Sequence, residues 1–348
     1  MNYLDQPNYQ LWNLKPTDFT KLKRLSDQLR FIATYGTLAP SSHNTQPWTL
    51  IIKDNVILIH ADLSRRLKAA DPTNKELYIS VGCTIPLIEI AASQYGFTTT
   101  TKLLPSPKNK NHIATITLTP STKKSSPHPL FPFITKRLTN RAKYNPQKSI
   151  PQPVINELNS FLKNSPLSLH LYTDRPTITH LAKLTQKAMY VALSNIKFRD
   201  ELASWVRHNW TMQGDGLPAN TLGFPDAMSI ILPTIVRSPL MAPKASEEEK
   251  KLITSSSAIG IITAPKDTLN YWVQSGHTYS LIALTVSKHK LAVEPLSATI
   301  EINKYTQALK TSLHLKYEPM MFFRIGYPKK PFPHAPRRPI TEVVSTKS

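Results

Sequence analysis

The chain has 348 residues, of which 40% are hydrophobic and 19% charged. It is long enough for one large or two medium domains, and its composition is that of a globular protein. The only cysteine, Cys83, excludes a disulfide framework and a multi-cysteine zinc site, and fits a reducing compartment. The formal net charge is +21, but Lys and Arg are spread along the chain without a nucleic-acid-binding motif. We therefore expect a solvated basic surface and no specific nucleic-acid partner.

Neither the start of the chain nor its most apolar stretch has the pattern of a membrane segment. Residues 1–6 lack a basic region followed by an apolar run, so we expect no signal peptide and a cytoplasmic location. Residues 227–242 are interrupted by Pro233, Arg237 and Pro239 and are too few to cross a bilayer. No membrane span is expected.

The nine glycines do not form a nucleotide-binding motif. None belongs to G-x-G-x-x-G, to a Walker A loop or to a G-x-S-x-G elbow. A Rossmann dinucleotide domain, a P-loop NTPase and an α/β-hydrolase are therefore disfavoured. A bound phosphate would have to be held largely by cationic side chains.

The first portion of the chain is mixed α+β. Apolar residues recur at spacings of three and four from Phe19 to Ile32 and predict an amphipathic helix. The later elements are a hairpin from 48–52 and 56–60, a buried helix over 76–94 that ends near Gly96, and strands near 99–104 and 112–119.

A second portion follows residues 120–130, which show no periodicity and predict a linker. Its expected elements are a strand near 167–172, a run of helices, a strand at 258–263, a helix at 269–288 and a strand at 320–325. We thus divide the chain into a first half at 1–119, a linker at 120–130 and a second half at 131–348. The segment at about 205–250 is rich in Gly, Pro and apolar residues and is long enough to act as a lid.

Two apolar segments repeat at an offset of 194 residues. Gly82, Thr84, Leu87, Ile88 and Ser93 match Gly276, Thr278, Leu281, Ile282 and Ser287. The repeat indicates two related halves whose long helices could pack together as in a symmetric dimer, here fused in one chain. The alternative is a chance likeness between two apolar helices.

Residues 39–48 form a polar loop, Ala-Pro-Ser-Ser-His-Asn-Thr-Gln-Pro-Trp. Its proline and polar residues are Pro40, Ser41, Ser42, Asn44 and Gln46, and Pro47 closes it. Their side chains donate and accept hydrogen bonds between prolines that restrict the backbone, which suits the edge of a flavin or a nucleobase. The alternative is an ordinary turn with a helix N-cap.

Two compact groups of arginines are candidates for holding an anion. Arg137, Thr139 and Arg141 place two guanidiniums on either side of a hydroxyl, and Arg337 and Arg338 form a second pair. Arginine binds phosphate with a bidentate fork. The alternatives are a solvated basic turn and a basic tail.

Catalytic side chains are not evident. Paired carboxylates and an H-E-x-x-H motif are missing, His43 is more typical of a structural histidine, and Cys83 lies on an apolar helix. The catalytic residues are therefore unknown, and if the chain is an enzyme, a cofactor supplies the reactive centre.

Together these motifs resemble the nitroreductase family of flavin mononucleotide (FMN) proteins. The likeness covers roughly residues 20–345 and is closest to the fused Acg-like branch, in which one chain does the work of two subunits. It rests on the polar loop, the Gly-led helix, residues 71–77 (Asp-Pro-Thr-Asn-Lys-Glu-Leu) and the Ile-Gly-Tyr and Arg-Arg-Pro groups near the end. Leu138 and Thr139 depart from the arginine and serine common in the family.

The resemblance implies an α+β nitroreductase-like fold, an intrachain pseudo-dimer, and one FMN between the halves. Arg137, Thr139 and Arg141 would hold the phosphate and ribityl end with Arg337 or Arg338, while the five polar-loop residues would line the flavin. The chain would pass electrons from NAD(P)H to a nitro compound, a quinone or another small-molecule acceptor.

Other functions and assembly states stay open on the sequence alone. One alternative is a non-catalytic FMN-binding or FMN-storing protein whose flavin is covered by the 205–250 segment, and a weaker one is a basic nucleic-acid-binding protein. A monomeric pseudo-dimer or a homodimer is expected.

Overall fold

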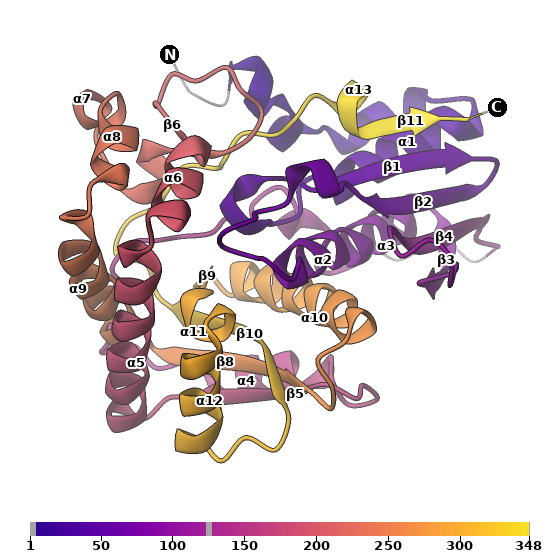
Figure 1. Cartoon of the computed structure of the whole chain (residues 1–348). Coiled ribbons are helices and arrows are strands. Elements are labelled where there is room, and N and C mark those ends of the chain that lie inside the picture. The colour runs from indigo at the N-terminus through magenta and orange to yellow at the C-terminus, as the bar shows by residue number, and fades with distance from the viewer. Residues whose placement is uncertain (1–4, 123–126, 348) are drawn as a thin grey trace.

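Two mostly antiparallel sheets organise the chain in the computed structural model, which describes residues 5–122 and 127–347 (Figure 1). The first sheet has the strand order β11-β1-β2-β4-β3 and the second the order β5-β8-β10-β9. The strands of the first sheet are β1 Trp48–Lys53, β2 Val56–Ala61, β3 Phe97–Leu103, β4 His112–Pro120 and β11 Val344–Thr346. Those of the second are β5 Ser168–Tyr172, β8 Ala258–Ala264, β9 Ala292–Pro295 and β10 Glu318–Gly326.

The two sheets share one topology. The order β1-β2-β4-β3 corresponds to β5-β8-β10-β9, and every neighbouring pair within these two runs is antiparallel. The central helices occupy the same place in both halves, between the second and third strands: α2 Lys75–Gly82 and α3 Thr84–Gln94 in the first, α10 Leu269–Lys288 in the second. The predicted α+β fold with two fused related halves is confirmed.

Two glycines place these central helices in direct backbone contact. A Cβ atom added to Gly82 would lie 2.3 Å from the carbonyl oxygen of Val273, and one added to Gly276 would lie 1.9 Å from that of Ile79. Val273 and Ile79 are themselves 194 positions apart (273 − 79), as are the glycines (276 − 82). The contact is therefore reciprocal, as at the two-fold axis of a dimer, and it favours related halves over a chance likeness.

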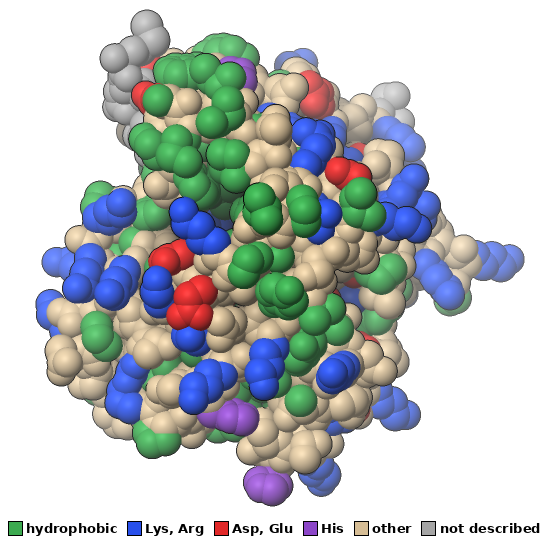
Figure 2. Space-filling view, turned by 60° about the vertical axis from the view of Figure 1, so that its left-hand side comes forward, with side chains coloured by type: hydrophobic (Ala, Val, Ile, Leu, Met, Phe, Trp, Pro, Cys, Tyr) green, Lys and Arg blue, Asp and Glu red, His purple; other side chains and the backbone are tan. Residues whose placement is uncertain are grey.

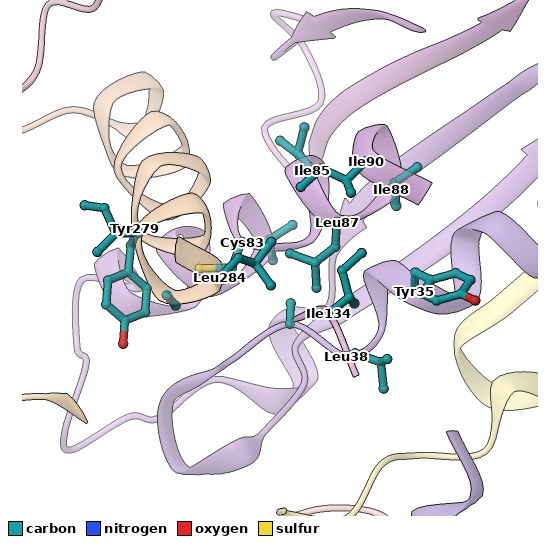
Figure 3. Close-up of a cluster of buried hydrophobic side chains, with 14 of the residues drawn as sticks. Tyr35, Leu38, Cys83, Ile85, Leu87, Ile88, Ile90, Ile134, Tyr279 and Leu284 are labelled. Carbon is teal, nitrogen blue, oxygen red and sulfur yellow. The ribbon is translucent and has the colours of Figure 1, made fainter. Parts of the chain in front are cut away.

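Apolar side chains fill the space around this crossing. Cys83 and Leu87 of the first half point toward Leu284 of α10, and Ile134 comes in from the segment after the linker (Figure 3). All four are at most 2% exposed. Burying such side chains stabilises the fold by about 1.5–3 kcal/mol each, so this core holds the halves together.

The helix predicted at 76–94 is two helices that meet at Cys83. Pro86 explains the break, since it has no N–H to donate to the carbonyl of Gly82 and its ring crowds that carbonyl. The first predicted helix also differs: α1 is Leu25–Gly36, and Phe19 lies in a separate 3₁₀ helix, Pro16–Lys21.

The second half contains a long insertion. In the first half only two residues separate β1 from β2, whereas residues 173–257 separate the corresponding β5 and β8. The insertion holds α5 Arg175–Ser194, α6 Ile196–Trp205, β6 Val206–Arg207, β7 Leu217–Pro218, α7 Asp226–Ser229, α8 Leu232–Arg237 and α9 Met241–Thr254. The remaining helices are α4 Gln152–Ser160, α11 Ala298–Glu301, α12 Asn303–Ser312 and α13 Ile340–Val343. Four residues of the predicted linker, 123–126, lie outside the described residues.

The end of the chain returns from the second half to the first. After β10 the chain crosses to the first sheet, where β11 pairs in parallel with β1 through Leu50 and Val344 (Figure 1). The first sheet is thus completed by a strand that follows the second half in the chain.

The insertion has an apolar outer face. Figure 2 turns the side with α7–α9 toward the viewer and shows hydrophobic side chains gathered on the upper part, with Lys and Arg scattered elsewhere. Among the residues described, nine of the ten exposed large hydrophobic residues lie at positions 190–240: Tyr190, Val191, Ile196, Trp210, Met212, Met228, Ile230, Ile231 and Leu240. The insertion is therefore amphipathic, since its inner side contacts the polar loop as described below.

Residues 75–94 are long and apolar enough to cross a membrane by length and composition. Within the fold, however, 83% of this stretch is buried, as is typical of core helices. It is also interrupted at Cys83.

Candidate functional site

Seven of the ten predicted site residues line one cavity at the junction of the two halves. They are Pro40, Ser41, Asn44, Arg137, Thr139, Arg141 and Arg337. The insertion contributes Leu217 and Thr221, and the N-terminal segment contributes Trp12. The cavity volume is about 40 Å³ in this conformation. Ser42, Gln46 and Arg338 lie beside the cavity rather than in its lining.

Arg137 and Arg337 are buried together in the cavity wall, 4% and 3% exposed. Both donate to the carbonyl of Leu38, from Nη2 of Arg137 at 3.2 Å and from Nη2 of Arg337 at 3.1 Å. Arg337 also donates to the carbonyl of Ala39 at 3.1 Å and to Oδ1 of Asn44 at 2.9 Å. The pair of guanidiniums therefore lies against the first part of the polar loop.

These two arginines have no acidic partner among residues 5–122 and 127–347. The Nε atoms of both are buried without a hydrogen-bond acceptor. Burial lowers the pKa of Arg137, and burial together with the charge of Arg137 lowers the pKa of Arg337 well below its usual value. Because an unpaired buried cation is costly, the pair forms a ready site for an anion.

Arg324 shows how the same fold treats a buried arginine that does have a partner. Its guanidinium is fully buried, donates to Glu294 at 2.5 Å and lies 3.9 Å from the ring of Tyr144. Burial lowers its pKa, but Glu294, together with Tyr144 and Glu249, raises the pKa by more, so that the net shift is upward. Arg337, in contrast, has no carboxylate beside it among the residues that the structure describes.

Arg141 and Thr139 reach the cavity from the same segment as Arg137. The Nε atom of Arg141 lies 3.5 Å from Oε1 of Glu294, and its Nη1 donates to the carbonyl of Thr221 at 3.2 Å. Thr139 forms a parallel β-bridge with Val293. Arg141 is thus partly neutralised by Glu294 and more exposed than Arg137.

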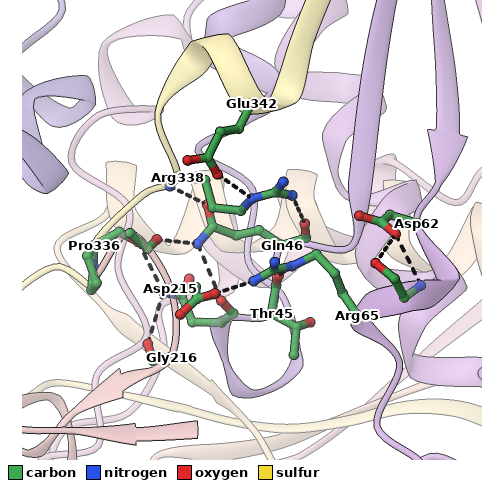
Figure 4. Close-up of polar contacts among 12 residues, drawn as sticks. Thr45, Gln46, Asp62, Arg65, Asp215, Gly216, Pro336, Arg338 and Glu342 are labelled. Carbon is green, nitrogen blue, oxygen red and sulfur yellow. Dashed lines mark hydrogen bonds and ion pairs between the residues drawn. The ribbon is translucent and has the colours of Figure 1, made fainter. Parts of the chain in front are cut away.

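The carboxamides of the polar loop bind other segments of the chain. Asn44 donates to the carbonyls of Gly216 and Pro336, both at 3.0 Å, and Gln46 donates to that of Gly214 at 2.7 Å and accepts from the backbone N–H of Arg338 at 3.0 Å. Gln46 and Arg338 lie face to face in Figure 4. These side chains therefore fasten the insertion and the C-terminal segment over the loop.

Three residues of the polar loop have a left-handed backbone conformation. His43, Asn44 and Gln46 all have positive φ, at 49°, 53° and 51°. Such conformations cost non-glycine residues free energy, least for Asn. The hydrogen bonds of Asn44 and Gln46 hold the loop in this shape.

Asp215 joins the insertion to the first half (Figure 4). Its carboxylate pairs with the guanidinium of Arg65 and, at 3.0 Å, with that of Arg207. Arg65 also donates from Nε to the carbonyl of Thr45 at 2.5 Å, next to Gln46. We call Asp215, Arg65 and Arg207 the latch.

The other polar-loop residues have separate partners. Ser42 donates from Oγ to Glu76 at 2.6 Å, and Oγ of Ser41 accepts from the backbone N–H of Gln46 at 2.9 Å. The pKa of His43 is lowered, chiefly by burial.

Cys83 lies outside the loop, between α2 and α3. Burial raises the pKa of its thiol to about 12, which makes it an inert apolar group as predicted.

Two aromatic residues of the site were missed from the sequence. The indole of Trp12 stacks on the ring of His334 with centroids 4.1 Å apart and donates from Nε1 to the carbonyl of Ala335 at 2.9 Å. Burial and the two arginines lower the pKa of His334 to about 3, so its ring is neutral. Neither residue lies in a motif, so only the fold could reveal them.

A buried acidic group lies behind the polar loop. The carboxyl of Asp71 is 4% exposed and accepts from the backbone N–H of Leu77 at 2.9 Å. Burial and the charge of Glu76 raise the pKa of Asp71 to about 7. Burial and the neighbouring carboxylates also raise that of Glu301, Glu76 first among them.

We expect the stability of the protein to fall as the pH rises through this region. The folded-state pKa of Asp71, about 7, exceeds its model value of 3.8, so the folded state binds more protons between these values. Stability is greatest below about pH 4 for this group and declines by a few kcal/mol toward pH 7, at about 1.4 kcal/mol per pKa unit. Urea titrations from pH 4 to 8 on wild type and Asp71→Asn measure this, and the variant should show the flatter profile. An unchanged slope would contradict the assignment.

Comparison with known proteins finds that the chain is similar to nitroreductases. No family model matches it. Two Mycobacterium tuberculosis proteins match over 325 residues. "Putative NAD(P)H nitroreductase Rv3131" is 22% identical and covers 92% of this chain and 91% of its own. "Putative NAD(P)H nitroreductase acg" is 23% identical and covers 91% and 95%.

Solved structures also match, with low scores. The FMN-dependent nitroreductase NfnB of Mycobacterium smegmatis, in complex with NADPH, has a TM-score of 0.39 and 15% identity and covers 60% of this chain and 94% of its own. The FMN- and NADPH-dependent nitroreductase NfnB from "sphigopyxis sp. strain HMH" has a TM-score of 0.42 and 13% identity and covers 63% of this chain and 99% of its own. Over nine-tenths of its length, then, the chain resembles the nitroreductase family, and Acg is among its relatives.

Proposed function

We propose that the chain is an FMN-dependent oxidoreductase of nitroreductase type that takes electrons from NAD(P)H. The observation that carries this proposal is the Arg137–Arg337 pair, two buried cations without a carboxylate at the junction of the halves. A phosphate would supply the missing negative charge. The names of the mycobacterial relatives support the same reaction type.

The residues around the cavity suit the chemistry of FMN, but the cavity is too small for FMN in this conformation. Arg137, Arg337 and, more weakly, Arg141 would hold the phosphate, with the hydroxyl of Thr139 beside them, while Arg338 would stabilise the surrounding loop through its bond to the carbonyl of Gln46 at 3.2 Å. A cavity of about 40 Å³ holds a water molecule but no tricyclic ring, so the covering segments must move for FMN to enter.

The polar loop would line the flavin from the other half. Pro40 and Ser41 already face the cavity, and Ser42 adjoins them. Asn44 and Gln46 bind the insertion in this conformation, so they position the loop and would reach a ligand only when the insertion opens. When bound, FMN accepts a hydride and passes electrons on, and the residues named here orient it and exclude water.

A specific observation also favours an FMN-storing function. The insertion touches the site at three places, through the carbonyls of Gly214, Gly216 and Thr221. A closed insertion would keep nicotinamide away from the flavin face, because hydride transfer needs the two rings in contact. Turnover distinguishes the two functions.

The visible absorption spectrum of the protein loaded with FMN, before and after anaerobic addition of NADPH, tests the proposal. Bleaching of the flavin bands would establish a reductase. Persistent bands would support storage, and failure to retain any flavin after soaking in FMN would overturn the cofactor assignment.

Release of the latch should speed the reaction with NADPH. In Asp215→Ala the carboxylate between Arg65 and Arg207 is lost, so the insertion opens more often. We expect flavin reduction to be roughly tenfold faster, equivalent to about 1.4 kcal/mol, as measured by stopped-flow absorbance.

Asp200→Ala is the matched control for the latch. Asp200 lies on the same insertion but pairs with Arg237 at 3.7 Å on the exposed surface. It should leave the rate unchanged. Equal rates in wild type and Asp215→Ala would show that the latch does not close the site.

A further inference from the structure

One aromatic side chain of the cavity has no role in the proposed function. The indole of Trp12 lies against both unpaired guanidiniums, 4.5 Å from that of Arg337 and 5.9 Å from that of Arg137 between ring centroid and Cζ. On this ring His334 is stacked as well. Trp12 is 5% exposed although it lies near the start of the chain. The indole thus lies against two guanidiniums and a stacked aromatic ring, as a bound planar ligand would.

We propose that Trp12 is a residue of the cofactor site whose indole acts as an internal placeholder: it covers the arginine pair in the cofactor-free chain and is displaced when FMN binds. This inference rests on the proposed function, since it takes FMN as the ligand. It adds a residue and a binding step that neither the motifs nor the relatives assign.

The charges of Arg137 and Arg337 explain why the indole of Trp12 lies against them. Two buried cations without an anion need some other source of negative potential. The face of a tryptophan ring provides one through cation–π attraction, and tryptophan is the strongest aromatic partner for it. A phosphate dianion interacts with guanidiniums more strongly through charge-assisted hydrogen bonds. FMN can therefore compete with the indole for the same cations.

The attachments of the N-terminal segment allow such an exchange. Trp12 belongs to a 3₁₀ helix, Pro7–Asn13, that is held by hydrogen bonds to loops and by Tyr9 and Trp12, which pack in the hydrophobic core. Asn8 donates to the carbonyls of Thr211 and Gln213, both at 2.9 Å, and accepts from the backbone N–H of Arg337 at 2.7 Å. Moving this helix breaks these bonds and takes Tyr9 and Trp12 out of the core, but it disrupts no strand or long helix.

The same bonds connect the placeholder to the segments that cover the site. Thr211 and Gln213 belong to the insertion, and Arg337 to the C-terminal segment. Departure of the N-terminal helix would loosen both. Entry of FMN is thus expected to be slow in wild type, because it waits for this helix to leave.

Fluorine NMR of the full chain labelled with 5-fluorotryptophan tests the displacement directly. The chain has five tryptophans, and the Trp12 resonance is assigned from Trp12→Phe. With FMN added, we expect this resonance to shift and to gain the solvent isotope effect of an exposed ring. The resonance of Trp48, which is fully buried, should not.

Kinetics provide a second, independent measurement. Trp12→Leu keeps an apolar side chain but removes the cation–π contact, so the apoprotein should bind FMN at least tenfold faster by flavin-fluorescence quenching. Trp210→Leu, at a half-exposed position on the insertion, is the control and should match wild type.

The outcomes separate this inference from the proposed function. Bound flavin with an unshifted, buried Trp12 resonance would overturn the placeholder and leave the cofactor assignment intact. So would a Trp12→Leu variant that binds FMN no faster, or retains it less well, than wild type, because Trp12 would then support the flavin rather than yield to it. If no variant and no wild-type protein retains FMN after dialysis, the proposed function itself is overturned.

Discussion

Replacing Arg337 by methionine should lower FMN affinity by about 10- to 150-fold while leaving the apoprotein folded. The lost contact is a charge-assisted hydrogen bond to phosphate, worth about 1.5–3 kcal/mol. Methionine removes a buried charge that no carboxylate balances, and this gain offsets the hydrogen bonds lost at Leu38, Ala39 and Asn44. We expect the free energy of unfolding to change by less than about 2 kcal/mol. Isothermal titration with FMN and urea denaturation measure the two effects.

Arg324→Met is the matched control for this prediction. It removes an equally buried arginine and takes from the buried Glu294 its nearest cation, leaving only Arg141 at 3.5 Å, so it should destabilise the fold by about 3–5 kcal/mol. Arg141→Ala should weaken FMN binding less than Arg337→Met, because Glu294 already balances part of the charge of Arg141. If Arg337→Met binds FMN as tightly as wild type, the arginine pair does not hold the phosphate.

Introducing a single methyl group at Gly276 should strongly destabilise the fold. The new Cβ atom would lie 1.9 Å from the carbonyl oxygen of Ile79, and both partners are backbone that cannot rotate away. Overpacking a core usually costs 1–3 kcal/mol, and this contact falls at or above that upper limit, so we expect Gly276→Ala to lose about 3 kcal/mol or more. Thermal and urea denaturation, and the yield of folded protein, report the loss.

Gly96→Ala provides the comparison. Gly96 has a φ of +82°, so alanine is strained there, but its Cβ would meet nothing within 4 Å. The expected cost is about 1–2 kcal/mol. A Gly276→Ala protein as stable as Gly96→Ala would mean that the two central helices can move apart, contrary to the packing described above.

Much of the fold could be predicted from sequence because its signals are local. The hairpin β1–β2, the helix α10 and the strand β10 follow from alternating or helical apolar patterns within one segment. The pairing of the halves also left a trace in the chain, since the close contact requires glycine at both Gly82 and Gly276. The break at Cys83 was missed although Pro86 signals it.

The site was predictable only where a motif carries it. The polar loop and the arginines were selected as residue types that suit a flavin and a phosphate, and seven of them do line one cavity. The roles within that cavity depend on distances between remote segments. Whether Arg137 has a carboxylate nearby, or Arg141 does, cannot be read from their neighbours in the chain, and Trp12 reaches the site across more than 120 positions.

The return of the chain end to the first sheet has a consequence for biosynthesis. The edge of β1 is covered by β11, so the first half lacks one strand until residues 344–346 have left the ribosome. Its backbone groups at Leu50 and Ile52 would meanwhile face outward, as an open edge that can pair with other chains. Domains made early in synthesis usually fold first, but here the earliest half must wait for the latest residues. Chains that end before residue 344 should therefore aggregate through β1, so β11 protects the first sheet against pairing with other chains.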